Sequence, residues 1–182
     1  MKITNKYGLP QPLVDAISKD NYSKGVATYS ATGLMNSPRI AMLREQHADK
    51  MEEDVSGKLY SFLGTALHSV FENATSANYL KEERLFTEVN GVKISGQIDL
   101  QETTPLGVVL WDYKFTSVWS VQNPKKEWEN QLNLYKYLVE TVKRQTVVGL
   151  KVCALLRDWT ANKTGTGYPE APCVVVDIPI WN

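Results

Sequence analysis

Apolar and polar positions change their spacing several times along the chain, and each change marks a new element. Between residues 57 and 77, apolar side chains recur at steps of three and four, which is the spacing of an amphipathic helix. They are Leu59, Leu63, Leu67, Val70 and Ala74. We expect this helix to cover a sheet, with two short helices before it, over residues 12–17 and from Ser37-Pro38 toward His47.

A meander of three strands follows the long helix. Apolar residues up to Val89 precede Asn90-Gly91, a strong signal for a two-residue hairpin, and alternation resumes on the returning strand. The turn Pro105-Leu106-Gly107 then leads into VVLWDYKFTS, residues 108–117, which begins as a buried strand.

A second long helix and two strands complete the pattern. Asn123-Pro124 predicts the N-terminus of this helix. Its inner side consists of Trp128, Leu132, Tyr135, Leu138 and Val142. Apolar runs over residues 147–156 and 173–180 predict strands, with a loop between them. The order of helix, meander, helix and strands indicates a mixed α/β (α+β) fold.

Composition excludes several classes of protein. The 182 residues carry twenty acidic and twenty basic side chains, so a polyanion would have to be met by a local patch. Two cysteines, Cys153 and Cys173, are too few for a four-thiolate zinc or iron–sulfur site. Nothing at the N-terminus reads as a signal peptide, and no apolar run approaches the roughly 20 residues that span a bilayer. We expect one cytoplasmic domain with no membrane contact, over 1–182, with a helical segment (1–55) before its core (56–182).

Two charges continue the buried row of the third strand. Because strand side chains alternate, Asp112 and Lys114 share a face with Val108 and Leu110. An isolated pair of this kind is most often a salt bridge at a strand end. Asp99, however, lies on the preceding strand where it can converge with Asp112, and two close carboxylates need a cation between them or one raised pKa. A divalent metal site is the simplest solution.

The long helix offers a third ligand. Gly64, His68 and Glu72 follow one another at steps of four, so they share one face of the helix. Two interpretations of His68 remain open, a metal ligand or a simple pair with Glu72. Gly64 could serve close packing alone.

The second long helix places an amide on its core-facing side. Gln131 lies one turn before Tyr135, and a buried amide requires hydrogen-bond partners. Gln131 either bonds a strand carbonyl or faces the charged cluster or a substrate phosphate.

Four stretches in this order resemble the motifs of the PD-(D/E)XK nuclease superfamily, and most of all its RecB-type exonuclease branch. They are GTALHSVFE, SGQIDL, WDYKFTS and QLNLYKYL, beside the motifs G-x-x-x-H-x-x-x-E, G-x-x-D, (D/E)-x-K and Q-x-x-x-Y. YSATGLMNSP also resembles the segment that opens many of these domains. The resemblance implies a restriction-endonuclease-like αβββαβ core and a metal-dependent DNA exonuclease of recombination and repair, in a cell or a phage.

The resemblance also implies roles for individual residues. The metal ligands would be His68, Asp99, Asp112 and the backbone carbonyl of Tyr113. The catalytic lysine would be Lys114, with Glu72, Gln131 and Tyr135 supporting the site or contacting DNA. Asp112 stands where many relatives have Glu, the four cysteines of the iron–sulfur members are missing, and no phosphate-binding loop is present. We therefore expect no iron–sulfur cluster, and any helicase, recombinase or single-strand-binding protein would be a separate partner.

Carboxylates suit Mg²⁺ and an imidazole ligand favours Mn²⁺, so either ion is expected to serve. Trp119, Lys125 and Lys126 interleave aromatic and basic groups after the metal strand, a pattern suited to single-stranded DNA or duplex ends. Such tryptophans are more often core or loop anchors. Two other functions remain open, a structure-specific endonuclease and a catalytically silent nucleic-acid-binding module.

Overall fold

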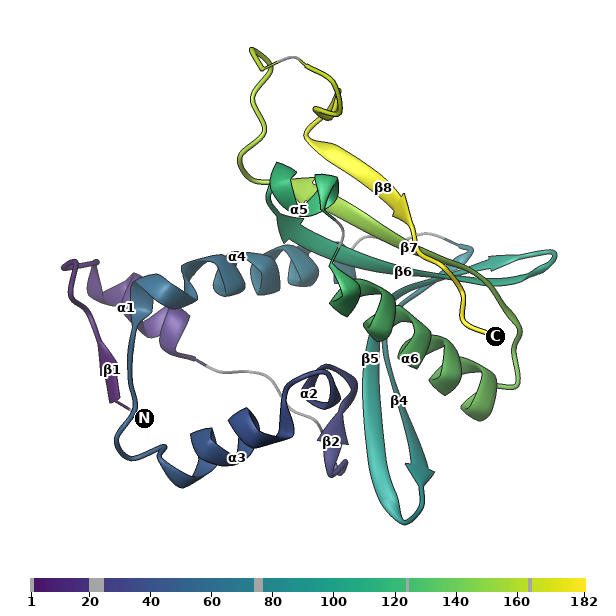
Figure 1. The fold of residues 1–182 in the computed structure, drawn as a ribbon, viewed down its shortest axis with the longest axis horizontal. Coiled ribbons are helices and arrows are strands. Elements are labelled where there is room, and N and C mark those ends of the chain that lie inside the picture. Colours follow the sequence, from purple (N-terminus) through teal and green to yellow (C-terminus); the bar gives the residue numbers. More distant parts are fainter. Residues whose placement is uncertain (1, 20–24, 74–76, 124, 164) are drawn as a thin grey trace.

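The computed structural model describes residues 2–19, 25–73, 77–123, 125–163 and 165–182. A six-stranded mixed sheet forms its centre, in the order β2-β5-β6-β7-β8 with β4 paired to β5 (Figure 1). Its strands are β2 (Tyr29–Ser30), β4 (Tyr79–Val89), β5 (Val92–Thr104), β6 (Gly107–Thr116), β7 (Val147–Leu156) and β8 (Cys173–Asp177). Three helices lie around them, α4 (Val55–Glu72), α5 (Val118–Gln122) and α6 (Lys126–Val142). The expected αβββαβ order and mixed α/β class are confirmed, with β6 and β7 parallel.

The hairpin between β4 and β5 forms as expected from its turn. Asn90 and Gly91 have φ values of 51° and 78°, the positive values that a two-residue type I′ turn requires. This turn pairs Val89 with Val92 and keeps one register along the hairpin. β7 spans the predicted residues, whereas β8 ends at Asp177, three residues early.

β5 and β6 diverge in a fork. They pair only from Leu100 and Trp111 to Thr104 and Gly107. Beyond that point β6 continues alongside β7, while β5 stays with β4 and receives β2 on its other side. Figure 1 shows β4 and β5 turning away from β6 and β7. The fork leaves room for polar side chains inside the sheet.

α6 covers one face of the sheet. Leu132, Leu138 and Val139 are completely buried. Val142 is 42% exposed, so its assignment to the inner side was wrong; it is the last residue of the helix. The predicted cap was also wrong, because α6 begins at Lys126 and the amide of Asn123 donates to the Trp119 carbonyl of α5 instead. Pro124 lies outside the described residues.

Gly96 allows α6 to approach β5. A Cβ at this position would lie 2.5 Å from Leu138 Cδ1 and 2.9 Å from Tyr135 Cε1. Because both side chains are buried, Gly96→Ala is expected to lower the free energy of unfolding by about 1–3 kcal/mol through overpacking. Gly64→Ala is the matched control: nothing lies within 4 Å of its Cβ, and helix propensity predicts about 0.5–1 kcal/mol of stabilisation. Chemical denaturation of both variants checks this, and equal effects would contradict it.

α4 touches the sheet less than its apolar stripe predicts. Leu63 and Val70 are 37% and 65% exposed, and Ala74 lies outside the described residues. The helix contacts α1 and β6, and Phe71 stacks on Tyr113 with ring centroids 4.6 Å apart. It therefore meets the sheet only in part and does not cover a full face.

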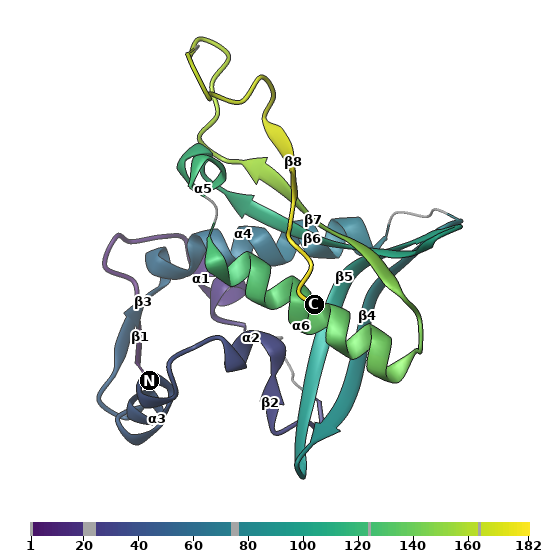
Figure 2. The same ribbon diagram turned by 45° about the vertical axis from the view of Figure 1, so that its right-hand side comes forward.

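The first 55 residues contain strands as well as helices. α1 (Gln11–Ser18) and α3 (Pro38–Gln46) match the two predicted short helices, and α2 (Ala31–Leu34) adds a third. β1 (Lys2–Thr4) and β3 (Glu52–Asp54) form a separate parallel pair, seen apart from the main sheet in Figure 2. β2 joins the central sheet, so this segment contributes to the core fold. Within the described ranges, no helix has the length and apolar character needed to cross a membrane.

Candidate metal centre

The fork between β5 and β6 contains a polar pocket of about 270 Å³. It brings together six of the residues that the sequence singled out: His68, Asp99, Asp112, Lys114, Gln131 and Tyr135. α4, β5, β6 and α6 each supply at least one of them. The expected convergence of these elements therefore exists in three dimensions.

Asp99 stands at the branch of the fork. Its Oδ2 accepts a hydrogen bond from the Tyr113 backbone N–H at 2.8 Å, just beyond the last backbone pairing of β5 with β6. The side chain thus satisfies a main-chain donor that the diverging strand no longer reaches. Asp99 is only 8% exposed, and its Oδ1 faces His68 Nδ1 at 3.6 Å.

Lys114 lies between a carboxylate and an amide. Its ammonium is 2.9 Å from Oδ1 and 2.7 Å from Oδ2 of Asp112, and it donates to Gln131 Oε1 at 3.0 Å. Gln131 Nε2 in turn donates to the Tyr135 hydroxyl at 2.9 Å. The Asp112–Lys114 pair is thus partly buried, with Asp112 in the interior, and is not an exposed strand-end bridge. Gln131 therefore faces the charged cluster, which was one of the two interpretations drawn from the sequence.

Asp112 Oδ2 has an incomplete environment. It is buried and makes no hydrogen bond of good geometry with any described residue, although the Lys114 ammonium lies 2.7 Å away. A buried carboxylate oxygen in this condition is costly unless another partner binds it. A cation in the pocket is such a partner.

A third carboxylate joins the cluster from β4. Glu82 Oε1 lies 3.3 Å from His68 Nδ1, and one ligand atom from each of His68, Glu82 and Asp99 lies within 4.8 Å of the others. The sequence analysis missed Glu82 and expected Glu72 to pair with His68 or to support the site. Glu72 is exposed at the end of α4, outside the residues that line the pocket.

Glu82 takes an unusual backbone conformation for a strand residue. Its φ is 49°, in the left-handed region that costs a side-chain-bearing residue free energy. The hairpin register places it opposite Asp99, where the ladder is interrupted. Gln97 Nε2 donates to its Oε2 at 2.7 Å, so both carboxylate oxygens have partners. The strained residue is therefore held with its carboxylate at the cluster.

The cluster retains protons in the absence of a cation. Burial, and then repulsion from Asp112, raises the pKa of Asp99 to about 7. The hydrogen bond with Glu82 is the largest cause that raises the pKa of His68. These shifts are expected where several acidic groups converge in a partly buried site.

Of the residues proposed for DNA contact, Gln131 and Tyr135 line this pocket, whereas Trp119, Lys125 and Lys126 lie outside it. Trp119 is 63% exposed on α5, so it is not a core anchor. Lys125 is an exposed residue at the start of α6. The Lys126 ammonium bonds Glu129 and lies 5.6 Å from the centre of the Trp181 ring, so intramolecular partners already hold it.

Comparison with known proteins identifies the family. A family model described as the PD-(D/E)XK nuclease superfamily matches residues 30–164. The chain belongs to this superfamily. Membership implies a nuclease that hydrolyses phosphodiester bonds, and PD-(D/E)XK nucleases use divalent metal ions. This confirms the resemblance at the level of the superfamily.

A solved structure has a similar fold. The crystal structure of SSO0001 matches with a TM-score of 0.57 and 17% identity, over 92% of this PD-(D/E)XK chain and 73% of that one. At this identity the similarity concerns the fold alone. No curated protein matches the chain.

The donor set of this PD-(D/E)XK protein suits a divalent cation. Three carboxylates and one imidazole offer oxygen and nitrogen ligands, and Asp112 Oδ2 is buried without a hydrogen bond among the described residues. Hard cations prefer carboxylate oxygen, and imidazole is accepted by Mn²⁺ more readily than by Mg²⁺. The residues present therefore fit the metal that the superfamily requires.

Cation binding is expected to strengthen as the pH rises. Because the pKa of Asp99 is raised, this group stabilises the metal-free fold below about pH 4 and loses that contribution as the pH rises through about 7. A cation must displace the same protons, and the raised pKa of His68 acts in the same direction. The increase in melting temperature caused by a fixed Mn²⁺ concentration should be larger at pH 7.5 than at pH 5.5. An equal increase at both values would contradict this linkage.

Proposed function

We propose that this chain is a divalent-metal-dependent deoxyribonuclease of the RecB-type exonuclease branch, acting at DNA ends or on single strands. One observation carries the proposal: His68 of α4, Asp99 of β5, and Asp112 and Lys114 of β6 come from three separate elements yet line one pocket at the fork. A silent binding module would not need a lysine beside converging carboxylates. A helicase, recombinase or single-strand-binding protein acting with it would be another chain, and the site of action would be cytoplasmic.

In the proposed mechanism one set of groups would bind the cation and Lys114 would take part in the reaction. His68, Asp99, Asp112 and the Tyr113 carbonyl would hold the cation, and Glu82 is added to this set because of its place in the cluster. A bound Mg²⁺ or Mn²⁺ would lower the pKa of a water molecule and neutralise negative charge on the substrate phosphate.

Lys114 would act on the attacking water. Its ammonium is held by Asp112 and Gln131, with Tyr135 orienting Gln131, so it needs little rearrangement to reach a water in the pocket. From there it would orient that water and stabilise negative charge that develops on the phosphate. Gln131 and Tyr135 are positioning residues in this arrangement.

Digestion of end-labelled DNA tests the proposal. Linear and covalently closed circular DNA, single- and double-stranded, are incubated with Mg²⁺, Mn²⁺ or chelator. We expect cleavage of linear DNA only, dependent on metal, with mononucleotides or short oligonucleotides released from ends. Cleavage of closed circles would identify an endonuclease, and absence of cleavage on every DNA and RNA substrate would refute the nuclease function.

Trp119 is proposed to stack on a nucleobase near the mouth of the site, with Lys125 and Lys126 contacting phosphates. Trp119 is 63% exposed and lies on α5, the element that follows β6. Trp119→Ala should weaken binding of single-stranded DNA by about 5- to 150-fold, corresponding to 1–3 kcal/mol per stacked base, with little change in melting temperature. Tyr7→Ala, which removes another exposed aromatic ring (75%), is the control. Unchanged DNA affinity in Trp119→Ala would remove this contact surface.

A further inference from the structure

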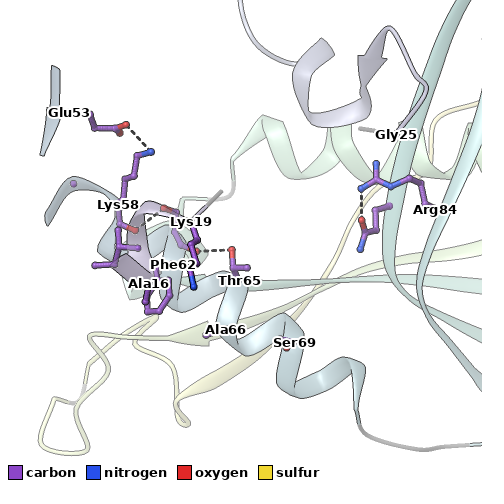
Figure 3. Close-up of a pocket in the computed structure, with 14 residues that line it drawn as sticks. Ala16, Lys19, Gly25, Glu53, Lys58, Phe62, Thr65, Ala66, Ser69 and Arg84 are labelled. Atoms are coloured by element: carbon purple, nitrogen blue, oxygen red, sulfur yellow. Dashed lines mark hydrogen bonds and ion pairs between the residues drawn. The ribbon is translucent and has the colours of Figure 1, made fainter. Parts of the chain in front are cut away.

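A second and larger pocket lies beside the metal centre. It has a volume of about 890 Å³ and runs between α4, the end of α1 and the β4–β5 hairpin. Figure 3 shows Lys19, Lys58 and Thr65 on one side of it and Arg84 on the other. None of the functional residues assigned so far accounts for this pocket.

The two pockets are adjacent. Thr65 of α4 and Gln97 of β5 line both of them. Gln97 also donates to Glu82 and accepts a hydrogen bond from Arg84, so one amide connects the metal cluster with the wall of the larger pocket. A polymer with its scissile phosphate at the fork would extend into this space.

The α4 wall includes a row of short side chains. Gly57, Ser61, Thr65 and Ser69 follow one another at steps of four and all line the pocket, beside Lys58, Phe62 and Ala66 of the same helix. The Ser61 and Thr65 hydroxyls donate to the Lys58 and Ser61 carbonyls, so this row offers close approach and not phosphate donors. A backbone of sugar and phosphate can lie close to such a surface.

Cationic groups border the same space. The Arg84 guanidinium is held against the wall by Ser95 Oγ, at 3.4 Å, and by Gln97 Oε1. Lys19 lines the opposite side. Lys58 is already paired with Glu53, another lining residue, at 3.2 Å, so we assign the phosphate contacts to Arg84 and Lys19.

We propose that this pocket is the track of a single nucleic-acid strand that continues from the scissile phosphate, with Arg84 and Lys19 as its phosphate contacts. The inference rests on the proposed nuclease function. The pocket has a volume of about 890 Å³ and lies between α4 and the β4–β5 hairpin, so we assign it to one strand. A track of this kind would favour a single strand over a duplex.

Binding of labelled oligothymidylates of two and twelve nucleotides tests the track. Affinities are measured by fluorescence anisotropy in the Lys114→Ala background, with Mn²⁺, so that binding is observed without cleavage. Lys19→Ala and Arg84→Ala should each weaken binding of the twelve-mer by about three- to tenfold and reduce the slope of log affinity against log salt by about 0.7. Ser61→Glu, which adds a carboxylate to the track, should weaken binding of the twelve-mer more than either of these substitutions does. None of the three substitutions should change binding of the dinucleotide.

Controls separate this proposal from the nuclease function itself. Lys163→Ala removes an exposed lysine outside the pocket and should bind the twelve-mer as the parent does. Lys19 and Ser61 are exposed, so thermal melts should show that these variants stay folded even if Arg84→Ala does not. Parental twelve-mer affinity in both folded variants would overturn the track.

Hydrolysis of bis(p-nitrophenyl) phosphate by the wild type, with Mn²⁺, tests the chemistry independently, because this small diester needs only the fork. If the wild type hydrolyses this diester but the track variants bind the twelve-mer as tightly as the parent, the track is refuted and the nuclease function stands. If the wild type hydrolyses neither this diester nor any nucleic acid, but the track variants bind the twelve-mer more weakly, the nuclease function is refuted and the track stands.

Discussion

Lys114→Ala is expected to lower the rate of phosphodiester cleavage by about 10²- to 10⁴-fold while cation binding persists. The ammonium contacts Asp112 and Gln131 but is not itself a metal ligand, because a cationic group cannot coordinate a cation. Removing it also removes the positive charge that competes with the metal for Asp112. Nuclease assays and calorimetric Mn²⁺ titration of the same preparation measure both effects.

Lys136→Ala provides the matched control for Lys114→Ala. Lys136 also forms a partly buried ion pair, with Glu140 at 2.9 Å, and it is not among the residues that line the fork pocket. This control should cleave DNA at the wild-type rate. Full activity in Lys114→Ala would refute the role of the lysine, and loss of Mn²⁺ binding in it would assign Lys114 to building the site and not to the reaction.

Asp99→Asn is expected to abolish stabilisation by metal and, in chelator at pH 8, to raise the melting temperature above that of the wild type. The amide oxygen still accepts the hydrogen bond of the Tyr113 N–H, whereas the repulsion from Asp112 that contributes to the raised pKa of Asp99 disappears. Loss of the carboxylate should weaken Mn²⁺ binding by more than about 100-fold, beyond the effect of supporting residues around a metal. Thermal melts with and without Mn²⁺ measure both changes.

The control for Asp99→Asn is Glu88→Gln, an exposed carboxylate on the same hairpin. It should melt like the wild type in chelator and retain the full Mn²⁺ effect. If Asp99→Asn kept the Mn²⁺ effect of the wild type, the metal centre would have to lie elsewhere. If it destabilised the metal-free protein, the carboxylate repulsion would be refuted.

The sequence predicted those parts of the site in which local periodicity continues undisturbed. Buried and less buried residues alternate from Val108 to Asp112, and Lys114 follows on the same face of β6 with partial burial. Gln131 and Tyr135 share the inner side of α6 for the same reason, with helical spacing. Alternation is a property of single elements, so it predicts which side chains point inward but not which distant elements meet them.

Glu82 shows where periodicity stops being sufficient. A φ of 49° interrupts the regular strand, and no propensity scale assigns that conformation to glutamate. One signal was nevertheless present. The two-residue turn at Asn90-Gly91 fixes the register of the hairpin, and continuing that register places Glu82 directly opposite Asp99. The hairpin register was therefore the signal that could have found the third carboxylate, whereas the face of α4 led only to His68 as a ligand and to Glu72 as its neighbour.

The remaining errors concern short or partly contacted helices. α5 has five residues, too few for a hydrophobic period, so the sequence analysis did not detect it. The apolar stripe of α4 was correctly read as a helix, yet Val70 faces solvent because only part of α4 meets β6. How much of a stripe is buried depends on the position of the helix over the sheet, which the stripe does not encode.

The fork also predicts that the N-terminal segment contributes to solubility. Where β5 leaves β6, only β2 pairs with its free side, through Tyr29 with Ile94 and Ser30 with Ser95. A shortened protein beginning at residue 56 would lose that cover and expose unpaired backbone donors and acceptors along an edge strand. Such an edge can recruit the same edge of another molecule and start aggregation. Two residues of β2 therefore protect the sheet against self-association, although they contribute no side chain to the metal cluster.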